Sequence, residues 1–278
     1  MSTHPFTQLD VFTDTPLQGN PLAVVHDARG LSDPQMQAFA RWMNLSETAF
    51  LLPPTDAQAD YRVRIFTPGR ELPFAGHPTL GSCHAWLEAG GVARNSVEVV
   101  QQCGVGLVRI RRDGARLAFA APPLMRSGAV DAATLADIAR SLRIPRAAIR
   151  ASQWVDNGPG WVAVLLGSRS ELLALRPDFA ALTPSNIGVI APCPPGHEAK
   201  FEVRAFIGDG GPTEDPVTGS LNASLAQWLT GAGLAPERYV AAQGTQLGRS
   251  GRVHIERVDG QIWVGGSSVS CLRGELIL

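Results

Sequence analysis

The fold is decided by the stretch Thr213-Glu214-Asp215-Pro216-Val217-Thr218-Gly219-Ser220, which leads from a loop into a helix. Apolar residues follow it at helical spacing: Leu221, Leu225, Trp228 and Leu229. We expect Thr218 or Ser220 to be the N-cap of this helix. A helix N-terminus offers unpaired N–H groups and a partial positive charge, and both favour an anion. The stretch therefore predicts a helix whose first turn can bind an acid group.

Two carboxylates, Glu214 and Asp215, stand directly before this helix. A glycine-rich approach precedes them, with glycines at Gly208, Gly210 and Gly211. The carboxylates would be useful beside a proton-transfer site, but they would equally complement the helix dipole. Taken alone, the stretch favours the second interpretation, in which the two carboxylates only complement the helix dipole.

The chain repeats this arrangement. Gly76-His77-Pro78-Thr79 leads into a second helical run, which Gly90-Gly91 closes. The run contains Leu80, Cys83, His84 and Leu87. Gly76 and Gly219 lie 143 positions apart (219 − 76). A helix with a glycine at its start is thus predicted in each half of the chain.

Other segments match between the halves at offsets that rise steadily. Leu22–Val25 matches Trp161–Val164 at 139 (161 − 22), Arg64–Phe66 matches Arg204–Phe206 at 140 (204 − 64), and the Asp113-Gly114 hairpin matches Asp259-Gly260 at 146 (259 − 113). A steady drift is typical of two copies separated by small insertions. The pattern predicts two αβ modules, residues 1–121 and 124–271, each a sheet around a mostly apolar helix.

The duplication also carries a geometric expectation. If a pseudo-twofold axis relates the modules, their helix N-termini face each other across one cleft, and clefts between domains are preferred ligand sites. Gly76 and Gly219 would then help to hold a substrate carboxylate.

One acidic residue breaks the repeat. At an offset near 141, Glu47 aligns with Gly188, which has no side chain (188 − 47). Apolar neighbours, Leu45 and Ala49–Leu52, indicate partial burial, which favours general acid/base catalysis near neutral pH. The alternative, an exposed turn at Ser46-Glu47-Thr48, stays open at this point.

Composition describes an ordinary globular protein. The chain has 278 residues, 45% hydrophobic and 18% charged, with a net charge of −1. This balance argues against nucleic acid or an anionic membrane as a partner, and no apolar run is long enough for a membrane span. Because Met1–His4 shows no basic-then-apolar signal, we expect a cytoplasmic protein.

The cysteines, lysines and histidines exclude several site types. No CxxC occurs among Cys83, Cys103, Cys193 and Cys271, and Lys200 is the single lysine. A zinc framework, a P-loop and a Schiff-base lysine are therefore not expected. The six histidines show no metal-ligand spacing, so no metal is expected.

Several stretches together resemble the PhzF family of phenazine-biosynthesis isomerases. They are Asp10–Thr13 with Gly19-Asn20-Pro21, Ser46–Phe50, Arg64–Pro68 with Glu71–Thr79, and Glu214–Ser220. The resemblance covers nearly the whole chain. It implies an α+β, diaminopimelate-epimerase-like fold of two pseudo-symmetric domains, with the strand 272–278 returning to the first. It also implies a homodimer and catalysis without a cofactor.

The resemblance assigns roles to individual residues. Glu47 would be the acid/base that moves a proton between two substrate positions. His77 and Asp215 would orient the substrate and help to shuttle a proton or hold an amine. Ser220 and the amides near Gly76 and Gly219 would bind the carboxylate of a small amino- or hydroxy-carboxylate. The family's namesake reaction isomerises trans-2,3-dihydro-3-hydroxyanthranilate.

Other functions stay open from sequence. Ser220, His77 and Asp215 have the residue types of a hydrolase triad, but Ser220 lacks a Gly-x-Ser-x-Gly elbow. A non-catalytic carboxylate-binding protein would retain the cleft but would not need Glu47. The same fold includes racemases with two thiols, but the loops Phe74–Gly76 and Asp215–Val217 contain no cysteine.

Overall fold

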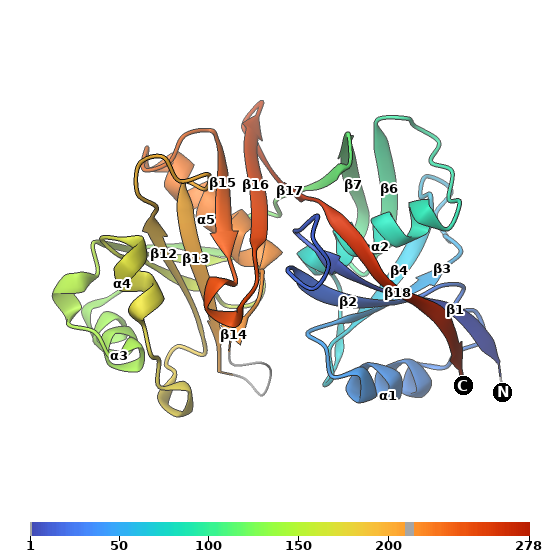
Figure 1. Cartoon of the computed structure of the whole chain (residues 1–278), viewed down its shortest axis with the longest axis horizontal. Coiled ribbons are helices and arrows are strands. Elements are labelled where there is room, and N and C mark those ends of the chain that lie inside the picture. Colours follow the sequence, from blue (N-terminus) through green and yellow to red (C-terminus); the bar gives the residue numbers. More distant parts are fainter. Residues whose placement is uncertain (1, 209–213) are drawn as a thin grey trace. The chain divides into compact units, whose positions relative to one another are not determined.

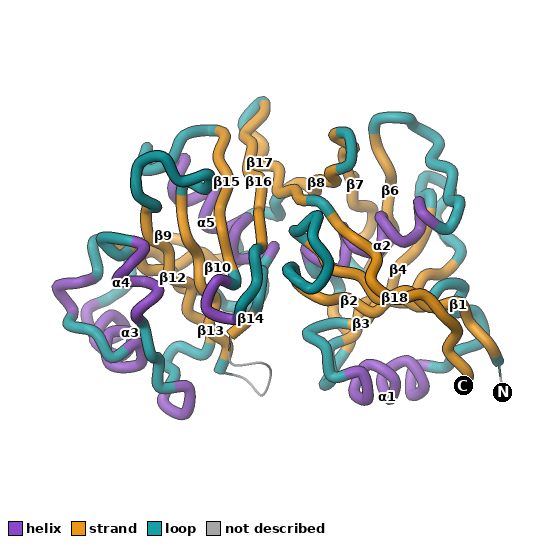
Figure 2. The backbone as a smooth tube through the Cα atoms, viewed as in Figure 1, coloured by secondary structure: helices purple, strands orange, loops and turns teal. Residues whose placement is uncertain are grey.

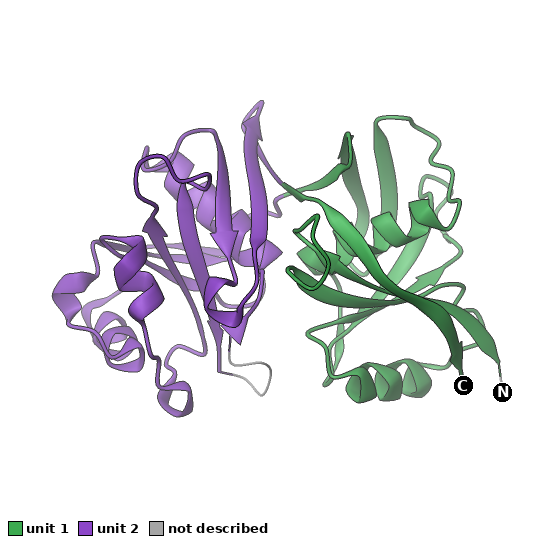
Figure 3. Cartoon of the chain, viewed as in Figure 1, with its two compact units in different colours: residues 1–120, 265–278 green, residues 121–264 purple. Residues whose placement is uncertain are grey.

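The computed structural model describes residues 2–208 and 214–278. Gly210, Gly211 and Thr213, named above for the approach to the second helix, lie outside the described residues. The chain divides into two compact units (Figure 3): unit 1 comprises residues 1–120 and 265–278, and unit 2 comprises residues 121–264.

Strands dominate both units (Figure 2). The elements of unit 1 are β1 (Thr3–Val11), β2 (Asn20–Val25), α1 (Asp33–Met43), β3 (Thr48–Leu52), β4 (Tyr61–Phe66), β5 (Glu71–Leu72), α2 (Gly76–Glu88), β6 (Glu98–Cys103), β7 (Gly106–Asp113), β8 (Arg116–Ala120) and β18 (Ser268–Ile277). Unit 2 begins with β9 (Arg126–Gly128), α3 (Ala132–Leu142), β10 (Ala151–Asp156), β11 (Val162–Leu165), α4 (Arg169–Ala174) and β12 (Asn186–Pro192). It continues with β13 (Phe201–Ile207), β14 (Glu214–Asp215), α5 (Gly219–Gly231), β15 (Arg238–Gln243), β16 (Gly251–Val258) and β17 (Gln261–Gly266), whose last two residues belong to unit 1. Short 3-10 turns lie at Arg146–Ala148, Phe179–Ala181 and Thr245–Leu247.

The strand pairing repeats between the units (Figure 1). In unit 1, β2 runs parallel to β3, β3 antiparallel to β4, β4 parallel to β6, and β6 antiparallel to β7. In unit 2, β11, β12, β13, β15 and β16 follow the same sequence of pairings. The predicted duplication is confirmed, and the fold is α+β with two similar units.

Strand β18 belongs to unit 1. It pairs antiparallel with β1 from Thr3 opposite Ile277 to Val11 opposite Ser268. The sequence predicts that the returning strand begins at residue 272 and that the second module ends at residue 271. In the structure the unit boundary falls between Val264 and Gly265. The chain returns to unit 1 earlier than predicted because β18 pairs with the backbone N–H and C=O groups of β1 along the whole length of that strand.

A buried helix lies inside each unit. In α2 the buried residues run without interruption from Gly76 to Cys83, and α5 is buried from Leu221 to Ala226. A helix that is buried all round belongs in a core rather than at a surface. The packing around α2 is close, since a Cβ on Gly81 would lie 2.5 Å from Leu22 Cδ2. None of the helices in the described ranges has both the length and the apolar character to cross a membrane.

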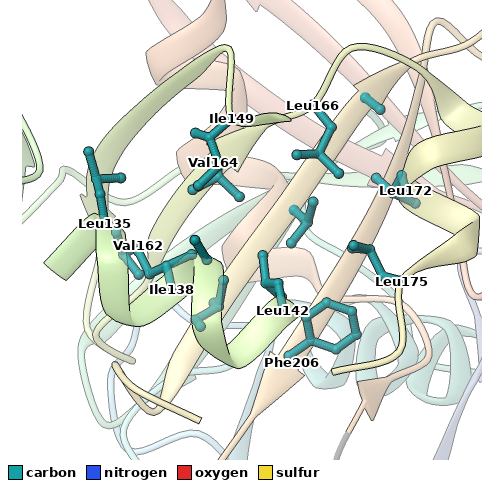
Figure 4. Packing of buried hydrophobic residues seen from close by; sticks show 14 of the residues in the cluster. Leu135, Ile138, Leu142, Ile149, Val162, Val164, Leu166, Leu172, Leu175 and Phe206 are labelled. Carbon is teal, nitrogen blue, oxygen red and sulfur yellow. The ribbon is translucent and has the colours of Figure 1, made fainter. Parts of the chain in front are cut away.

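Outer helices cover the sheets. In unit 2, α3 and α4 contribute Ile138, Leu142 and Leu172 to an apolar cluster with Val164 and Phe206 (Figure 4). In unit 1, α1 makes a similar cluster with β2, β3 and β4. These outer cores fix the sheets, and the sheets in turn hold the central helices.

Candidate active site

The N-terminus of α2 has no side-chain cap. Its N-cap residue, Ala75, is extended (φ −151°, ψ 143°) and has no polar side chain to offer. Gly76 and His77 follow, and the third helical residue, Pro78, has no N–H group. No side chain caps the N–H groups of Gly76 and His77 at the start of α2, so these groups can bind an anion.

Glu47 lies beside His77 at this helix start. Glu47 Oε2 is 3.5 Å from His77 Nδ1, and the two side chains are 16% and 5% exposed. Burial lowers the pKa of His77 to about 3, with the Pro21 carbonyl acting in the opposite direction. His77 is therefore neutral near pH 7 and carries one N–H and one lone pair. The predicted partial burial of Glu47 is confirmed, and the exposed-turn alternative is wrong.

The two nitrogens of the His77 ring have different surroundings. Asn20 Nδ2 lies 3.4 Å from His77 Nδ1, and Asn20 is fully buried at the start of β2. His77 Nε2 is buried and has no hydrogen-bond partner among the residues that the structure describes. An unpartnered buried nitrogen is costly unless a ligand or water satisfies it.

The start of α5 has the expected N-cap residue, but its side chain caps no N–H group. Thr218 occupies the N-cap position, but its hydroxyl donates to Asp215 Oδ2 at 2.6 Å and caps no helix N–H. Of the two predicted N-caps, Thr218 is confirmed, although its hydroxyl is taken by Asp215, and Ser220 lies inside the first turn. Like α2, α5 begins without a side-chain cap.

Ser220 is the second residue of α5, as His77 is of α2. Ser220 Oγ accepts a hydrogen bond from Trp161 Nε1 at 3.1 Å, and Asn157 Nδ2 donates to the Ser220 carbonyl at 3.0 Å. With its oxygen accepting from an indole, the Ser220 hydroxyl proton is directed to another acceptor.

Glu214 has a structural role. Arg204 Nε and Nη2 donate to its two carboxylate oxygens at 2.8 and 2.7 Å, and Arg204 Nη1 also reaches the carbonyls of Leu172 and Leu175. Arg64 and Glu71 form the same fork in unit 1, at 2.7 and 2.6 Å. Each fork ties the strand before a central helix to the sheet. Sequence reasoning missed this pair, although both of its members recur between the repeats.

Strand register corrects the alignment of Glu47. Ala23 pairs with Thr48 between β2 and β3, and Val162 pairs with Ile187 between β11 and β12. The counterpart of Glu47 is therefore Asn186, not Gly188. Glu47 and Asn186 are 139 positions apart (186 − 47), the same offset that relates β2 to β11. The first change in the offset comes later in the chain, after β3.

The expected site residues thus fall into two groups. Unit 1 brings Glu47, His77 and Gly76 together, and unit 2 brings Asp215, Gly219 and Ser220 together. Sequence reasoning gave no role to Asn20, although the Gly19-Asn20-Pro21 turn marked it, and it had no signal for Trp161. Within residues 2–208 and 214–278, no group of three or more His, Cys, Asp or Glu side chains could hold a metal ion.

Comparison with known proteins decides the family. The sequence profile of the phenazine biosynthesis-like proteins (PhzC-PhzF) matches residues 9–274. The chain belongs to the PhzF family. Among its relatives are antisense-enhancing sequence 1 of Schizosaccharomyces pombe, 34% identical, and an uncharacterised isomerase of Mesorhizobium japonicum, also 34% identical. The alignments cover 99% and 100% of this chain, and equal shares of the two relatives.

A third relative has a named reaction. The trans-2,3-dihydro-3-hydroxyanthranilate isomerase of Pseudomonas chlororaphis is 32% identical, over 99% of this chain and 100% of its own. Since this relative and the Mesorhizobium protein are both named isomerases, the present PhzF-family chain is an isomerase.

Solved structures agree on the fold. A PhzF-family protein of Bacillus anthracis is similar with a TM-score of 0.85 at 23% identity, covering all of both chains. A predicted epimerase of Pseudomonas aeruginosa is similar at 0.77 and 30%, covering 99% of each chain. A hydroxyproline epimerase of Agrobacterium vitis is similar at 0.61 and 13%, covering 99% of this chain and 92% of its own. The fold is thus shared by PhzF proteins and epimerases.

Proposed function

We propose that this PhzF-family isomerase moves a proton on a small amino- or hydroxy-carboxylate by acid/base catalysis, without a cofactor. One observation carries the proposal: the Glu47 carboxyl lies 3.5 Å from the ring of the buried, neutral His77, at a helix start with no side-chain cap. A carboxyl group and a neutral imidazole can pass a proton, and the helix N–H groups favour a carboxylate.

The proposed roles follow from this chemistry. Glu47 takes a proton from one substrate carbon and returns it at another. His77 and Asp215 orient the substrate. The amides at Gly76 and Gly219, together with the Ser220 hydroxyl, bind its carboxylate. The named reaction of the Pseudomonas chlororaphis relative makes a dihydro-hydroxyanthranilate the first compound to try.

The hydrolase alternative has less support. Trp161 Nε1 donates to Ser220 Oγ, and an indole N–H has no lone pair with which to act as a base. A helix-terminal hydroxyl held in this way fits a ligand donor better than a nucleophile.

Proton NMR in D2O tests the proposal. Trans-2,3-dihydro-3-hydroxyanthranilate and a panel of small amino- and hydroxy-carboxylates are incubated with the wild type and with Glu47→Gln. We expect deuterium to enter one compound, or a proton to migrate within it, with the wild type only. Glu47→Gln should still bind that compound, measured by equilibrium dialysis. Equal exchange by both proteins would contradict the role of Glu47, and binding of a panel carboxylate without exchange would favour a binding protein.

A further inference from the structure

In each unit, the second residue of the central helix faces a nitrogen donor at or just before the start of a strand. In unit 1, Asn20 Nδ2 lies 3.4 Å from His77 Nδ1. In unit 2, Trp161 Nε1 lies 3.1 Å from Ser220 Oγ. Asn20 begins β2, and Trp161 directly precedes β11, the counterpart of β2. Both donors are shielded from water, since Asn20 is fully buried and Trp161 is 2% exposed.

We propose that Asn20 is a positioning residue whose amide N–H donates to His77 Nδ1 and keeps the ring proton on Nε2. The inference rests on the proposed role of His77 in catalysis. A neutral imidazole has one N–H and one lone pair, and an amide NH2 group can only donate. When Nδ1 accepts from this group, the ring proton is on Nε2.

Glu47 competes for the same nitrogen. Its Oε2 lies 3.5 Å from His77 Nδ1, and an ionised carboxylate there favours a proton on Nδ1. Once Glu47 has taken a proton, its O–H can donate to Nδ1, in agreement with the arrangement that Asn20 imposes. Asn20 therefore removes the dependence of the ring tautomer on the ionisation of Glu47, so the ring does not rearrange during each proton transfer.

This tautomer determines what His77 offers to a ligand. Nε2 is the nitrogen that is buried without a partner among the described residues. As an N–H donor it would orient an oxygen of the substrate, whereas as a lone pair it would bind an ammonium group. Asn20 thereby restricts the substrate group next to His77 to a hydrogen-bond acceptor.

Nitrogen-15 NMR of the resting enzyme tests the tautomer without any substrate. We expect the wild-type His77 ring to show an unprotonated Nδ1 and a protonated Nε2. Asn20→Asp keeps the shape but replaces the donor with an acceptor, so we expect the proton to move to Nδ1 and kcat to fall on the order of 10²-fold, with KM little changed. Asn20→Ala, the second variant, should give a mixture of tautomers that follows the pH. Trp161→Phe, which removes the matching donor in unit 2, is the control and should leave the His77 ring signals unchanged.

Two results would overturn the inference. One is a wild-type ring with its proton on Nδ1. The other is an unchanged tautomer in both Asn20 variants. Because these signals are read in the resting enzyme, they are independent of whether any panel compound exchanges a proton, so failure of the proposed reaction would be recognised separately.

Discussion

The starts of α2 and α5 occupy equivalent places in the two units but carry different chemistry. The second helical residue is His77 in unit 1 and Ser220 in unit 2. Glu47, which directly precedes β3 in unit 1, has Asn186 of β12 as its counterpart in unit 2. The residue after the forked glutamate is Leu72 in unit 1 and Asp215 in unit 2. Each unit thus keeps the helix start and changes the groups around it.

The difference separates scaffold from chemistry. Features that recur, such as the arginine–glutamate fork and the glycine at the helix start, hold the backbone in place. Features that do not recur, Glu47, His77 and Asp215, are the ionisable groups of the proposed reaction. The repeat therefore provides an internal control for each proposed role.

The largest effect should come from giving unit 1 the residue of unit 2. Glu47→Asn removes the acid/base, and we expect kcat to fall about 10²- to 10⁴-fold. The matched change in unit 2, Asn186→Gln, keeps an amide and should lower kcat far less. Steady-state kinetics on the compound found by NMR measures both. Similar losses in the two variants would show that Glu47 has no special role.

The two forks should differ strongly in their effect on stability. Arg204 and Glu214 are 6% and 8% exposed, so Glu214→Gln leaves a buried charge without its partner and should destabilise unit 2 by about 3–5 kcal/mol. Glu71 is 42% exposed, and Glu71→Gln should change stability by about 0–1 kcal/mol. Urea unfolding followed by tryptophan fluorescence measures both. Equal shifts would mean that burial does not distinguish the forks.

Packing beneath the helix starts also differs. A Cβ on Gly188 would lie 2.4 Å from Leu221 Cδ1, whereas its counterpart in unit 1 is already an alanine, Ala49. Gly188→Ala should destabilise unit 2 by about 1–3 kcal/mol through overpacking. Adding Leu221→Val should restore part of the loss, as thermal unfolding would show. A neutral Gly188→Ala would indicate that Leu221 has room to move.

His77 should make stability depend on pH, whereas Ser220 cannot. The pKa of His77 is about 3 in the folded protein, against about 6.5 in an unfolded chain. Between these values the unfolded chain binds more protons, so stability falls as pH decreases, by up to about 1.4 kcal/mol per pH unit. The stability that the neutral His77 contributes is fully present above pH 6.5, the pKa in the unfolded chain.

The experiment compares urea unfolding of wild type and His77→Gln from pH 7 to pH 4.5. We expect the variant to lose this part of the slope, and Ser220→Ala, the control from unit 2, to keep it. Burial also lowers the pKa of His26 and His84, but these residues act in all three proteins. An unchanged slope in His77→Gln would mean that His77 is not buried in its neutral form.

Much of the fold could be predicted because it is periodic. Both central helices and both hairpins follow from apolar spacing and from turn residues. Matching segments at rising offsets predicted the duplication, which the strand pairing confirms. These signals are local, so one sequence carries them.

The candidate site was less predictable because its contacts are not local. Asn20 meets His77 across 57 positions, and Trp161 meets Ser220 across 59. No spacing rule links residues at such distances. The misalignment of Glu47 with Gly188 has the same origin, since only the pairing of β2 with β3 and of β11 with β12 fixes that register. The arginine–glutamate forks could have been predicted, because the arginine and the glutamate both occur at equivalent positions in the two repeats.

The pairing of β18 with β1 affects the order in which the protein can fold. Since β18 follows all of unit 2 in the chain, a ribosome completes residues 121–264 before it makes the strand that completes unit 1. Unit 2, which is continuous in sequence, can fold as it emerges. One edge of β1 can pair with β2 at once, whereas the other edge must wait for β18 from the far end of the chain. Until then, an edge of unit 1 stays open to other strands, so chaperones would be most useful during this interval.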